Sequence, residues 1–277
     1  MGLRIKTNVQ STVAQHRLHE SRESLEHTQN KLASGSRIIK AMDDAAGLAI
    51  SESLRSTLRS TGQNIKNTQD AFFMLQTADS AIEEITNIVI RMKELAVQSA
   101  SDTNGDKERG YLDHEYQQLK MELNRISESA QFNGRPLLNG QGETIAIQVG
   151  PNNNPNIDRI YISTGFKINT DSLGVGEFGI DKVEAARNSL EPIEGALDVI
   201  AQVRGAIGAG ESRINTTLRS LMHYQENIAG AYSQIRDADI AHETSEFAKH
   251  NILTQSSVAV LAQANQIPAI ALKLIGT

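Results

Sequence analysis

Apolar residues recur at alternating spacings of three and four along the chain. One such register contains Leu75, Ala78, Ile82, Ile85, Val89, Met92 and Ala96. A second contains Leu112, Tyr116, Leu119, Leu123, Ile126 and Ala130. This is the a/d pattern of helices that pack as coiled coils. A segment rich in Ser, Asp and Gly separates the two registers and is typical of a turn. We therefore predict helices over about 75–99 and 112–130.

A longer register lies in the C-terminal half. From Ala186 to Ile235 it contains fifteen positions, of which twelve are apolar, whereas the 39% average of the chain would give about six. The three exceptions are polar: Arg204, Glu211 and Gln225. A helix over this span would be roughly 75 Å long at about 1.5 Å per residue. Such a rod requires partner helices to cover its apolar stripe.

The segment between these helices has the pattern of a β-hairpin. Three aliphatic residues alternate with other residues over 143–149, and 159–163 provides a returning strand. Residues 150–156 between them are all Gly, Pro or Asn, which favours a loop longer than the tightest turns. A loop-rich segment, 165–181, then leads into the long helix.

Both ends of the chain carry thinner apolar stripes. The N-terminal stripe contains Val9, Val13, Leu18, Leu25 and Leu32. The C-terminal stripe contains Ile240, Phe247, Val258, Leu261, Ile267, Ile270 and Leu274. Isolated helices with so few apolar contacts are marginal in water, but each aliphatic side chain contributes about 1.5–3 kcal/mol when it is buried. We predict that the ends pair with each other and become ordered only in an assembly.

The predicted fold is therefore mainly α: a long coiled-coil helix bundle with a small β-hairpin, in which the N- and C-terminal helices pair. Aromatic residues are 4% of the chain, and the apolar residues are mostly Ala, Ile, Leu and Val. That composition favours seams between helices over a thick globular core.

Charge and composition exclude several function classes. The chain has no Cys, which excludes disulfides and thiolate metal sites. The net charge is −6 with both signs interleaved and no basic tract, so nucleic-acid binding has little support. The sequence has no apolar run long enough to span a membrane and no signal peptide at its start. These features fit the cytosol, or export by a route that uses no cleaved signal.

Candidate chemistry is weak. His242 and Glu243 could begin a zinc-protease H-E-x-x-H motif, but Glu246 stands where the second His would be. His16 and His19 are three residues apart without an obvious third ligand. We expect no catalytic residue, no metal site and no cofactor, and we do not expect an enzyme.

Several motifs, in order along the chain, closely resemble those of bacterial flagellins. They are Lys31–Ile38, Asp43–Ile50, Gln76–Ile82, Met92–Ser99, Phe132–Gly134 with Pro136–Gly140, Ser233–Ala241 and Gln263–Pro268. The resemblance covers nearly the whole chain. The gap between the hairpin and the long C-terminal helix is too short for the variable outer region of most flagellins, so the chain resembles a minimal flagellin.

The resemblance implies a structural subunit that polymerises into the flagellar filament for motility, by coupled folding and docking of its terminal helices. It implies a secreted, extracellular protein that assembles with itself, alone or with other flagellins. Further implied partners are the flagellar export apparatus, an export chaperone, the filament cap and the hook-junction proteins. No nucleic acid or membrane partner is implied.

The resemblance also implies a division into layers. Residues 1–44 would form the N-terminal part of an inner coiled-coil domain with a linker, and 237–277 its C-terminal helix. Residues 45–182 would form the first part of a second-layer domain, with two helices, the hairpin and loops, and 183–236 its long C-terminal helix. The expected linker residues are Gly35, Asp43, Asp44 and Gly47.

One predicted helix face carries a further expectation. Arg91, Leu95 and Gln98 are spaced four and three apart, which places them on one face, and Glu115 lies on the following helix. In flagellins, matching residues meet the flagellin-sensing Toll-like receptor of animal hosts and lie where subunits stack axially. The resemblance thus implies both roles for these four residues.

Two other functions fit part of the pattern. A hook–filament junction (hook-associated) protein shares the terminal helices but matches the Asp43–Ile50 and Glu94–Ser99 motifs less well. A lipid-binding amphipathic protein would use the thin apolar stripes, but the hairpin and the scarcity of basic residues beside the stripes do not favour it.

Overall fold

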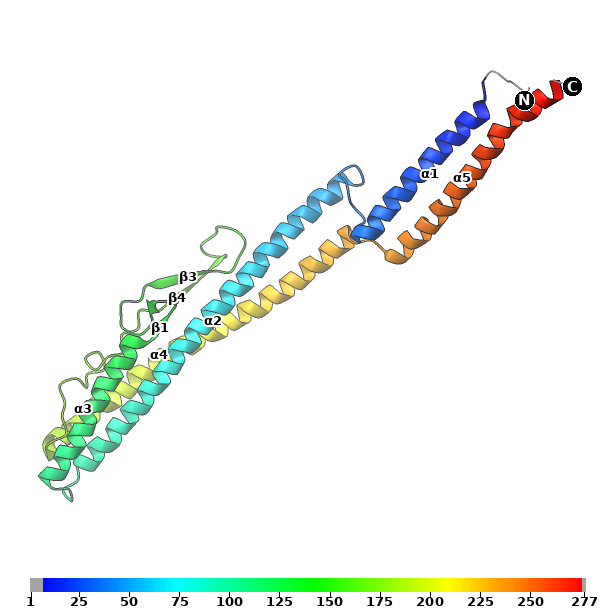
Figure 1. Cartoon of the computed structure of the whole chain (residues 1–277). Coiled ribbons are helices and arrows are strands. Elements are labelled where there is room, and N and C mark those ends of the chain that lie inside the picture. The colour runs from blue at the N-terminus through cyan, green and yellow to red at the C-terminus, as the bar shows by residue number, and fades with distance from the viewer. Residues whose placement is uncertain (1–6, 276–277) are drawn as a thin grey trace. The chain divides into compact units, whose positions relative to one another are not determined.

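The computed structural model describes residues 7–275, with side chains over 7–266. The helices are α1 (Val9–Ser34), α2 (Ala45–Ser99), α3 (Asp106–Ser129), α4 (Val183–Arg236) and α5 (Ile240–Ile275). The strands are β1 (Gln131–Phe132), β2 (Arg135–Pro136), β3 (Thr144–Gln148) and β4 (Arg159–Ser163). This confirms the mainly α fold with a small hairpin, and Figure 1 shows the elements.

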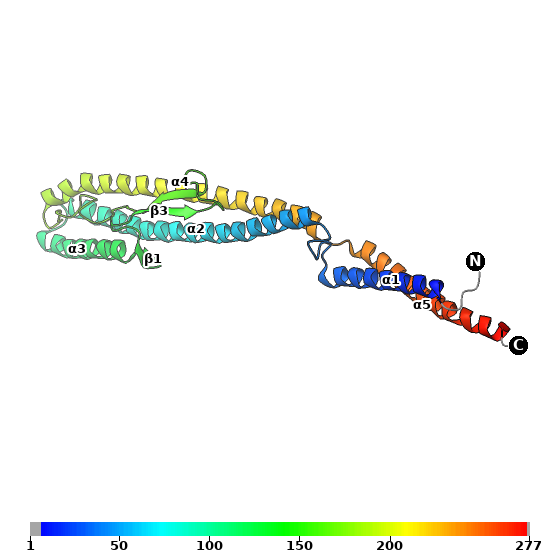
Figure 2. The same cartoon turned by 90° about the horizontal axis from the view of Figure 1, so that it is seen from above.

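The chain divides into two compact units. The terminal unit comprises the described residues of Met1–Ser56 and Asn227–Thr277, and the central unit comprises Thr57–Glu226. Within the terminal unit α1 and α5 lie side by side (Figure 1). Within the central unit α3 and α4 both run alongside α2 (Figure 2).

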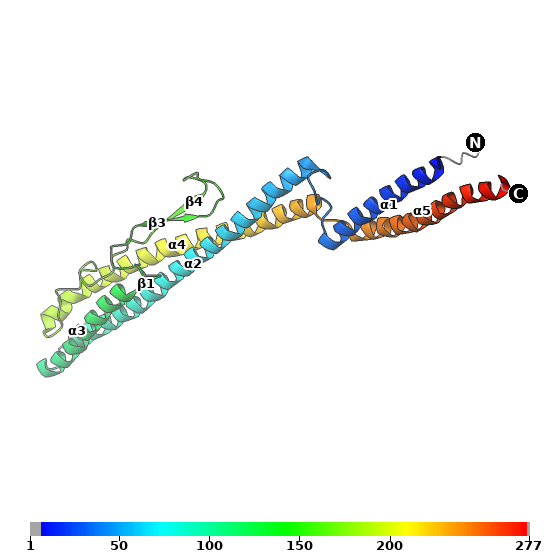
Figure 3. The same ribbon diagram turned by 45° about the horizontal axis from the view of Figure 1, so that its top comes forward.

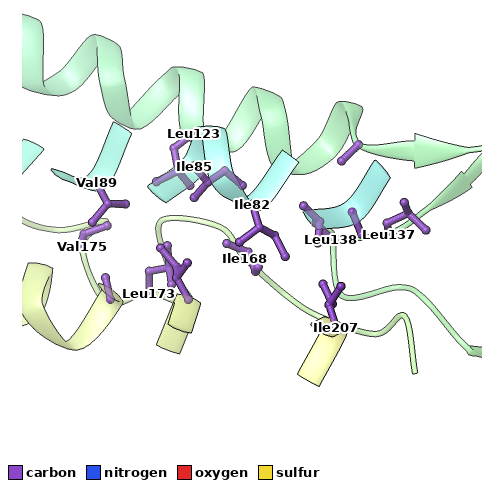
Figure 4. Close-up of a cluster of buried hydrophobic side chains, with 14 of the residues drawn as sticks. Ile82, Ile85, Val89, Leu123, Leu137, Leu138, Ile168, Leu173, Val175 and Ile207 are labelled. Carbon is purple, nitrogen blue, oxygen red and sulfur yellow. The ribbon is translucent and has the colours of Figure 1, made fainter. Parts of the chain in front are cut away.

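The predicted seam of α2 forms the centre of the core in the central unit. All seven predicted seam residues from Leu75 to Ala96 are at most 5% exposed. Figure 4 shows Ile82, Ile85 and Val89 together with Leu123 of α3 and Ile207 of α4. The a/d pattern of the sequence therefore corresponds to real helix packing within one chain.

The register of α4 is also confirmed. Alternate seam positions from Ala186 to Ile214 are buried, and the positions between them are partly buried. The polar exception Arg204 lies at the edge of the seam, where its Nε and Nη2 donate to Asp79 Oδ1 and Oδ2 at 3.0 and 3.2 Å. This charged pair joins α4 to α2 without placing an unpaired charge in the core.

Two helices begin earlier than predicted. α2 begins at Ala45 rather than near 75, and α3 begins at Asp106 rather than at Leu112. The first half of α2 continues the same register, but its seam positions include Thr61, Asn64 and Thr68. Because those residues are polar, apolar periodicity alone does not detect this half of the helix.

The predicted hairpin is present. β3 and β4 pair antiparallel from Thr144 opposite Ser163 to Gln148 opposite Arg159, and β4 buries Ile160 and Ile162. The smaller hairpin of β1 and β2 was not predicted, because each strand has only two residues. Its turn is Asn133-Gly134, both with positive φ, which is the favoured chemistry for a two-residue hairpin loop.

Candidate functional site

Polar contacts fix the register of α1 against α5. At one end Asn8 Nδ2 donates to the carbonyl of Ala264 at 2.9 Å, and Ser11 Oγ donates to Asn265 Oδ1 at 2.8 Å. At the other end of α1, Lys31 Nζ donates to Glu243 Oε1 at 3.2 Å. The contacts show that the two helices are antiparallel, which confirms the predicted pairing of the chain ends.

This helix pair buries few large apolar side chains. The buried residues of α1 are Ser11, Ala14 and Thr28, and those of α5 among the described side chains are Glu243 and Ala264. The fully buried positions of the α1–α5 contact are therefore small or polar. The core of the central unit is very different, because it consists of aliphatic side chains, two methionines and one tyrosine.

The predicted terminal stripes are not closed seams within one chain. Four of their residues are exposed: Val9 at 56%, Val13 at 54%, Ile240 at 52% and Val258 at 46%. Five are partly buried: Leu18, Leu25, Leu32, Phe247 and Leu261. The side chains of Ile267, Ile270 and Leu274 lie outside the described residues. The partly buried stripe residues follow the same three- and four-residue spacing as the buried residues of α1 and α5, so part of each stripe joins the α1–α5 contact and the rest lies outside it.

An apolar groove of about 950 Å³ lies between α1 and α5. Its apolar lining includes Val9, Val13 and Ala14 from α1 and Leu253, Val260 and Ala264 from α5. Apolar surface that lies together in one groove and remains in contact with water marks a docking surface. We call this feature the terminal groove.

A short linker separates α1 from α2. It begins at Gly35, whose φ of 65° ends α1 in the left-handed conformation that glycine adopts without strain. Backbone hydrogen bonds fasten the linker to the end of α4, from the Arg37 amide to the Arg236 carbonyl at 2.7 Å and from the Ala238 amide to the Gly35 carbonyl at 2.9 Å. Gly35, Asp43 and Asp44 therefore lie where a linker was expected.

Gly47 was expected in the linker but lies in the first turn of α2, where it is buried. Its amide donates to Asp44 Oδ1 at 2.8 Å, so Asp44 caps the beginning of α2. A Cβ at this position would overlap the Asp44 carboxylate and lie 2.9 Å from Cδ1 of Ile38. A larger residue at position 47 would displace the side chains of Asp44 and Ile38. This close packing explains the glycine, and a need for a flexible linker does not.

Asp43 holds the linker together. Its Oδ2 accepts hydrogen bonds from the amides of Ile39 at 3.0 Å and Lys40 at 2.9 Å, and its Oδ1 lies 3.1 Å from His27 Nε2 of α1. The Lys40 amide, with the Ile39 amide and His27, lowers the pKa of Asp43 to about 2, against the opposing effect of burial. The ionised carboxylate is therefore the form that the folded linker stabilises.

We expect acid to loosen this linker. Because the folded pKa is below the usual 3.8, the stabilisation is complete above pH 4 and is lost as the pH falls toward 2. Asp43→Asn should show faster exchange of the Ile39 and Lys40 amides already at pH 6, measured by NMR. The exposed Asp70→Asn is the matched control. Equal exchange of these two amides in the Asp43 variant and in the control would show that Asp43 does not hold the linker.

The face expected to meet other molecules is only partly available. Arg91 Nη1 and Nη2 each lie 2.9 Å from a carboxylate, Glu94 Oε2 and Glu115 Oε1 respectively, and this pairing raises the pKa of Arg91. Gln98 is exposed on the same helix. Leu95 is fully buried, because it lies beside the seam position of Ala96. Leu95 therefore packs in the core and is not available to a second molecule.

The described residues contain no group of three or more His, Asp and Glu side chains placed to hold a metal ion. In the incomplete protease motif, Glu243 pairs with Lys31 and Glu246 pairs with Lys249 at 3.0 Å. Over the described part of the chain, no helix is sufficiently long and apolar to cross a membrane.

Comparison with known families gives two matches. The bacterial flagellin N-terminal helical region matches residues 5–143, and the bacterial flagellin C-terminal helical region matches residues 190–275. Together these regions cover most of the chain.

Individual relatives agree. A flagellin of Halalkalibacterium halodurans is 39% identical over 245 residues, covering 88% of this chain and 89% of that protein. The flagellar filament 33 kDa core protein of Treponema phagedenis is 36% identical over 286 residues, covering 98% and 99%. A flagellin of Bacillus subtilis is 33% identical over 307 residues, covering 99% and 100%.

Solved structures support the fold. Bacillus cereus flagellin has a TM-score of 0.50 at 31% identity, covering 56% of this chain and 88% of that one. A putative flagellar hook-associated protein from Vibrio parahaemolyticus has a TM-score of 0.59 at 10% identity, covering 70% and 100%. At that identity the second likeness concerns the fold alone.

Proposed function

This chain belongs to the bacterial flagellin family and is a structural subunit of the flagellar filament, and we propose that it polymerises by docking its terminal groove on further copies of itself. The family is structural. The hook-associated alternative is not favoured, because that likeness is only 10% identical whereas flagellins match at 39% and 33%.

The observation that carries this proposal is the contrast between the two units. The core of the central unit lies entirely within residues 71–214, so it is complete in one chain. In the terminal unit Val9, Val13 and Val260 of the terminal groove remain about half exposed. Burying such side chains contributes about 1.5–3 kcal/mol each, and copies of the same groove would provide the cover. We infer that α1 and α5 gain most of their stability in the polymer.

The proposal includes the layers and the partners. Residues 1–44 and 237–277 would form the inner layer of the filament, and 45–236 the second layer. Arg91, Gln98 and Glu115 would contribute to axial contacts between subunits and to a face for a host Toll-like receptor. The route would be secretion without a cleaved signal, through the flagellar export apparatus with an export chaperone. The filament cap and the hook-junction proteins would be the partners at the two ends.

A charge placed in the terminal groove tests the proposed mechanism. Leu253 is 44% exposed, so Leu253→Lys should leave the helical content of the monomer unchanged. In the polymer the lysine would be buried, and the loss of about 1.5–3 kcal/mol per subunit corresponds to a roughly 10- to 100-fold higher critical concentration. Sedimentation of assembled fibres measures this concentration.

Leu253→Met is the matched control, because it keeps an apolar side chain of similar volume at the same position. It should assemble at close to the original critical concentration. If the lysine variant assembled as readily as the methionine variant, the terminal groove would not be a docking surface.

A further inference from the structure

The seam of α2 changes character at Ala71. From Ala71 to Ala96 its buried positions are apolar. The preceding buried positions in the central unit are Thr68, Asn64 and Thr61, which are 0%, 4% and 1% exposed. These side chains are as buried as the aliphatic ones, yet each carries a polar group. We call these three residues the polar seam.

Helix α4, which faces α2, also changes in character at this level. A Cβ at Gly210 of α4 would lie 3.3 Å from Cδ1 of Leu75, and a Cβ at Gly62 would lie 3.5 Å from Nε2 of Gln225. These two contacts place the polar seam opposite residues 218–225 of α4. That segment contains Gln225, a polar exception in the α4 register, and the fully buried core residues of α4 end at Ile214.

One side-chain donor of the polar seam is unsatisfied. Asn64 Nδ2 is buried without a hydrogen-bond partner, and Thr68 Oγ1 donates to the Asn64 carbonyl of its own helix at 2.7 Å. Among the described residues, no hydrogen bond joins the side chains of the polar seam to α4. An unpartnered buried donor loses its hydration without replacement, so this part of the α2–α4 contact is weaker than the apolar part.

The hairpin rests on the same stretch of α2. Asn67 Nδ2 donates to the carbonyl of Gln148, the last residue of β3, at 3.2 Å. A shift of α2 near residue 67 therefore displaces the end of β3. Figure 3 shows this hairpin lying over the helices of the central unit.

We propose that the polar seam is a conformational joint, at which α2 and α4 change their mutual packing while the apolar seam of residues 71–96 stays closed. A seam of polar residues costs coiled-coil stability, and segments with weak packing open first. The chain uses this joint to adapt the packing of α2 and α4 to its neighbours in an assembly. This last role rests on the proposed function, whereas the joint itself is a property of the single chain.

Amide exchange on the monomer tests the joint directly. We expect amides of residues 61–68 to exchange at least about tenfold faster than those of residues 82–92 in the same helix. Replacing the polar seam by Thr61→Val, Asn64→Leu and Thr68→Val should slow exchange at 61–68 about tenfold, because the orphan donor is removed. Thr86→Val, in the apolar part of α2, is the control and should not change exchange at 61–68.

If the triple variant does not fold, Asn64→Leu alone gives the same test. Equal exchange of the two segments in the wild-type monomer overturns the joint, and so does a variant that folds but exchanges at 61–68 as fast as the wild type. Neither result depends on polymer formation, so failure of the joint is distinguishable from failure of the proposed function.

Spin-label distances test the change of packing on assembly. The chain has no cysteine, so Gln63→Cys with His223→Cys reports on the joint, and Glu84→Cys with Gln202→Cys reports on the apolar seam. In fibres diluted with unlabelled chain, the distance of the first pair should shift and the second should stay constant. Unchanged distances for both pairs overturn the adaptive role. If the wild-type chain forms no fibres, the proposed function fails, and amide exchange still decides the joint.

Discussion

Removal of residues 238–277 should abolish fibre formation and leave the central unit folded. The deletion removes α5 and with it one wall of the terminal groove. The core of the central unit contains no residue of α1 or α5, so its free energy of unfolding should change by less than about 0.5 kcal/mol. We expect no sedimenting polymer at concentrations at which the full chain assembles.

The control for this deletion is the unfolding of the truncated chain in urea, followed by circular dichroism. A cooperative transition with the midpoint of the full-length central unit would show that the loss of fibres is not a loss of folding. Fibres of the truncated chain would refute the assembly mechanism. A truncated chain that fails to fold would instead refute the independence of the central unit.

Truncation of a core side chain should instead destabilise the central unit itself. Ile85 lies in the seam of α2 and is fully buried, so Ile85→Ala leaves a cavity and should lower the free energy of unfolding by about 2–5 kcal/mol. Ile90 is on the same helix but is 45% exposed, and Ile90→Ala should cost much less, on the order of 0.5 kcal/mol. The comparison keeps residue type and helix the same.

Urea titration of both variants measures this difference. A midpoint for Ile85→Ala within experimental error of Ile90→Ala would mean that the α2 seam does not carry the stability of the central unit. Assembly of the core variant should fall only as far as its folded fraction falls, because Ile85 is not exposed to a neighbour.

Much of the central unit could be predicted from the sequence, because its helices bury one stripe each. The stripes from Leu75 to Ala96 and from Ala186 to Ile214 correspond to real seams, since helical periodicity determines which residues share a face. The first half of α2 was missed for the converse reason. There the buried face carries Thr61, Asn64 and Thr68, and no apolar period marks it.

Single positions were harder to predict than helices. Gly47 belongs to a motif beside the linker, but the sequence does not show that the Asp44 cap brings it into α2. Leu95 shares a helix face with Arg91 by spacing, yet it is fully buried while Arg91 remains about half exposed. Spacing along a helix shows which side chains share a face. How far the packed neighbours extend around that face decides which of these side chains are buried.

The sequence by itself determined most of the helices and the larger hairpin, because period and turn residues act locally along the chain, and it indicated the pairing of the chain ends. Only the tertiary structure decided which apolar stripes are closed. Val9 and Ile82 follow similar patterns, but Val9 is 56% exposed and Ile82 is fully buried. Ile82 belongs to a core cluster built from α2, α3, α4 and the loops, whereas the fully buried residues between α1 and α5 are small or polar. Under the proposed assembly mechanism, further copies of the chain would cover Val9.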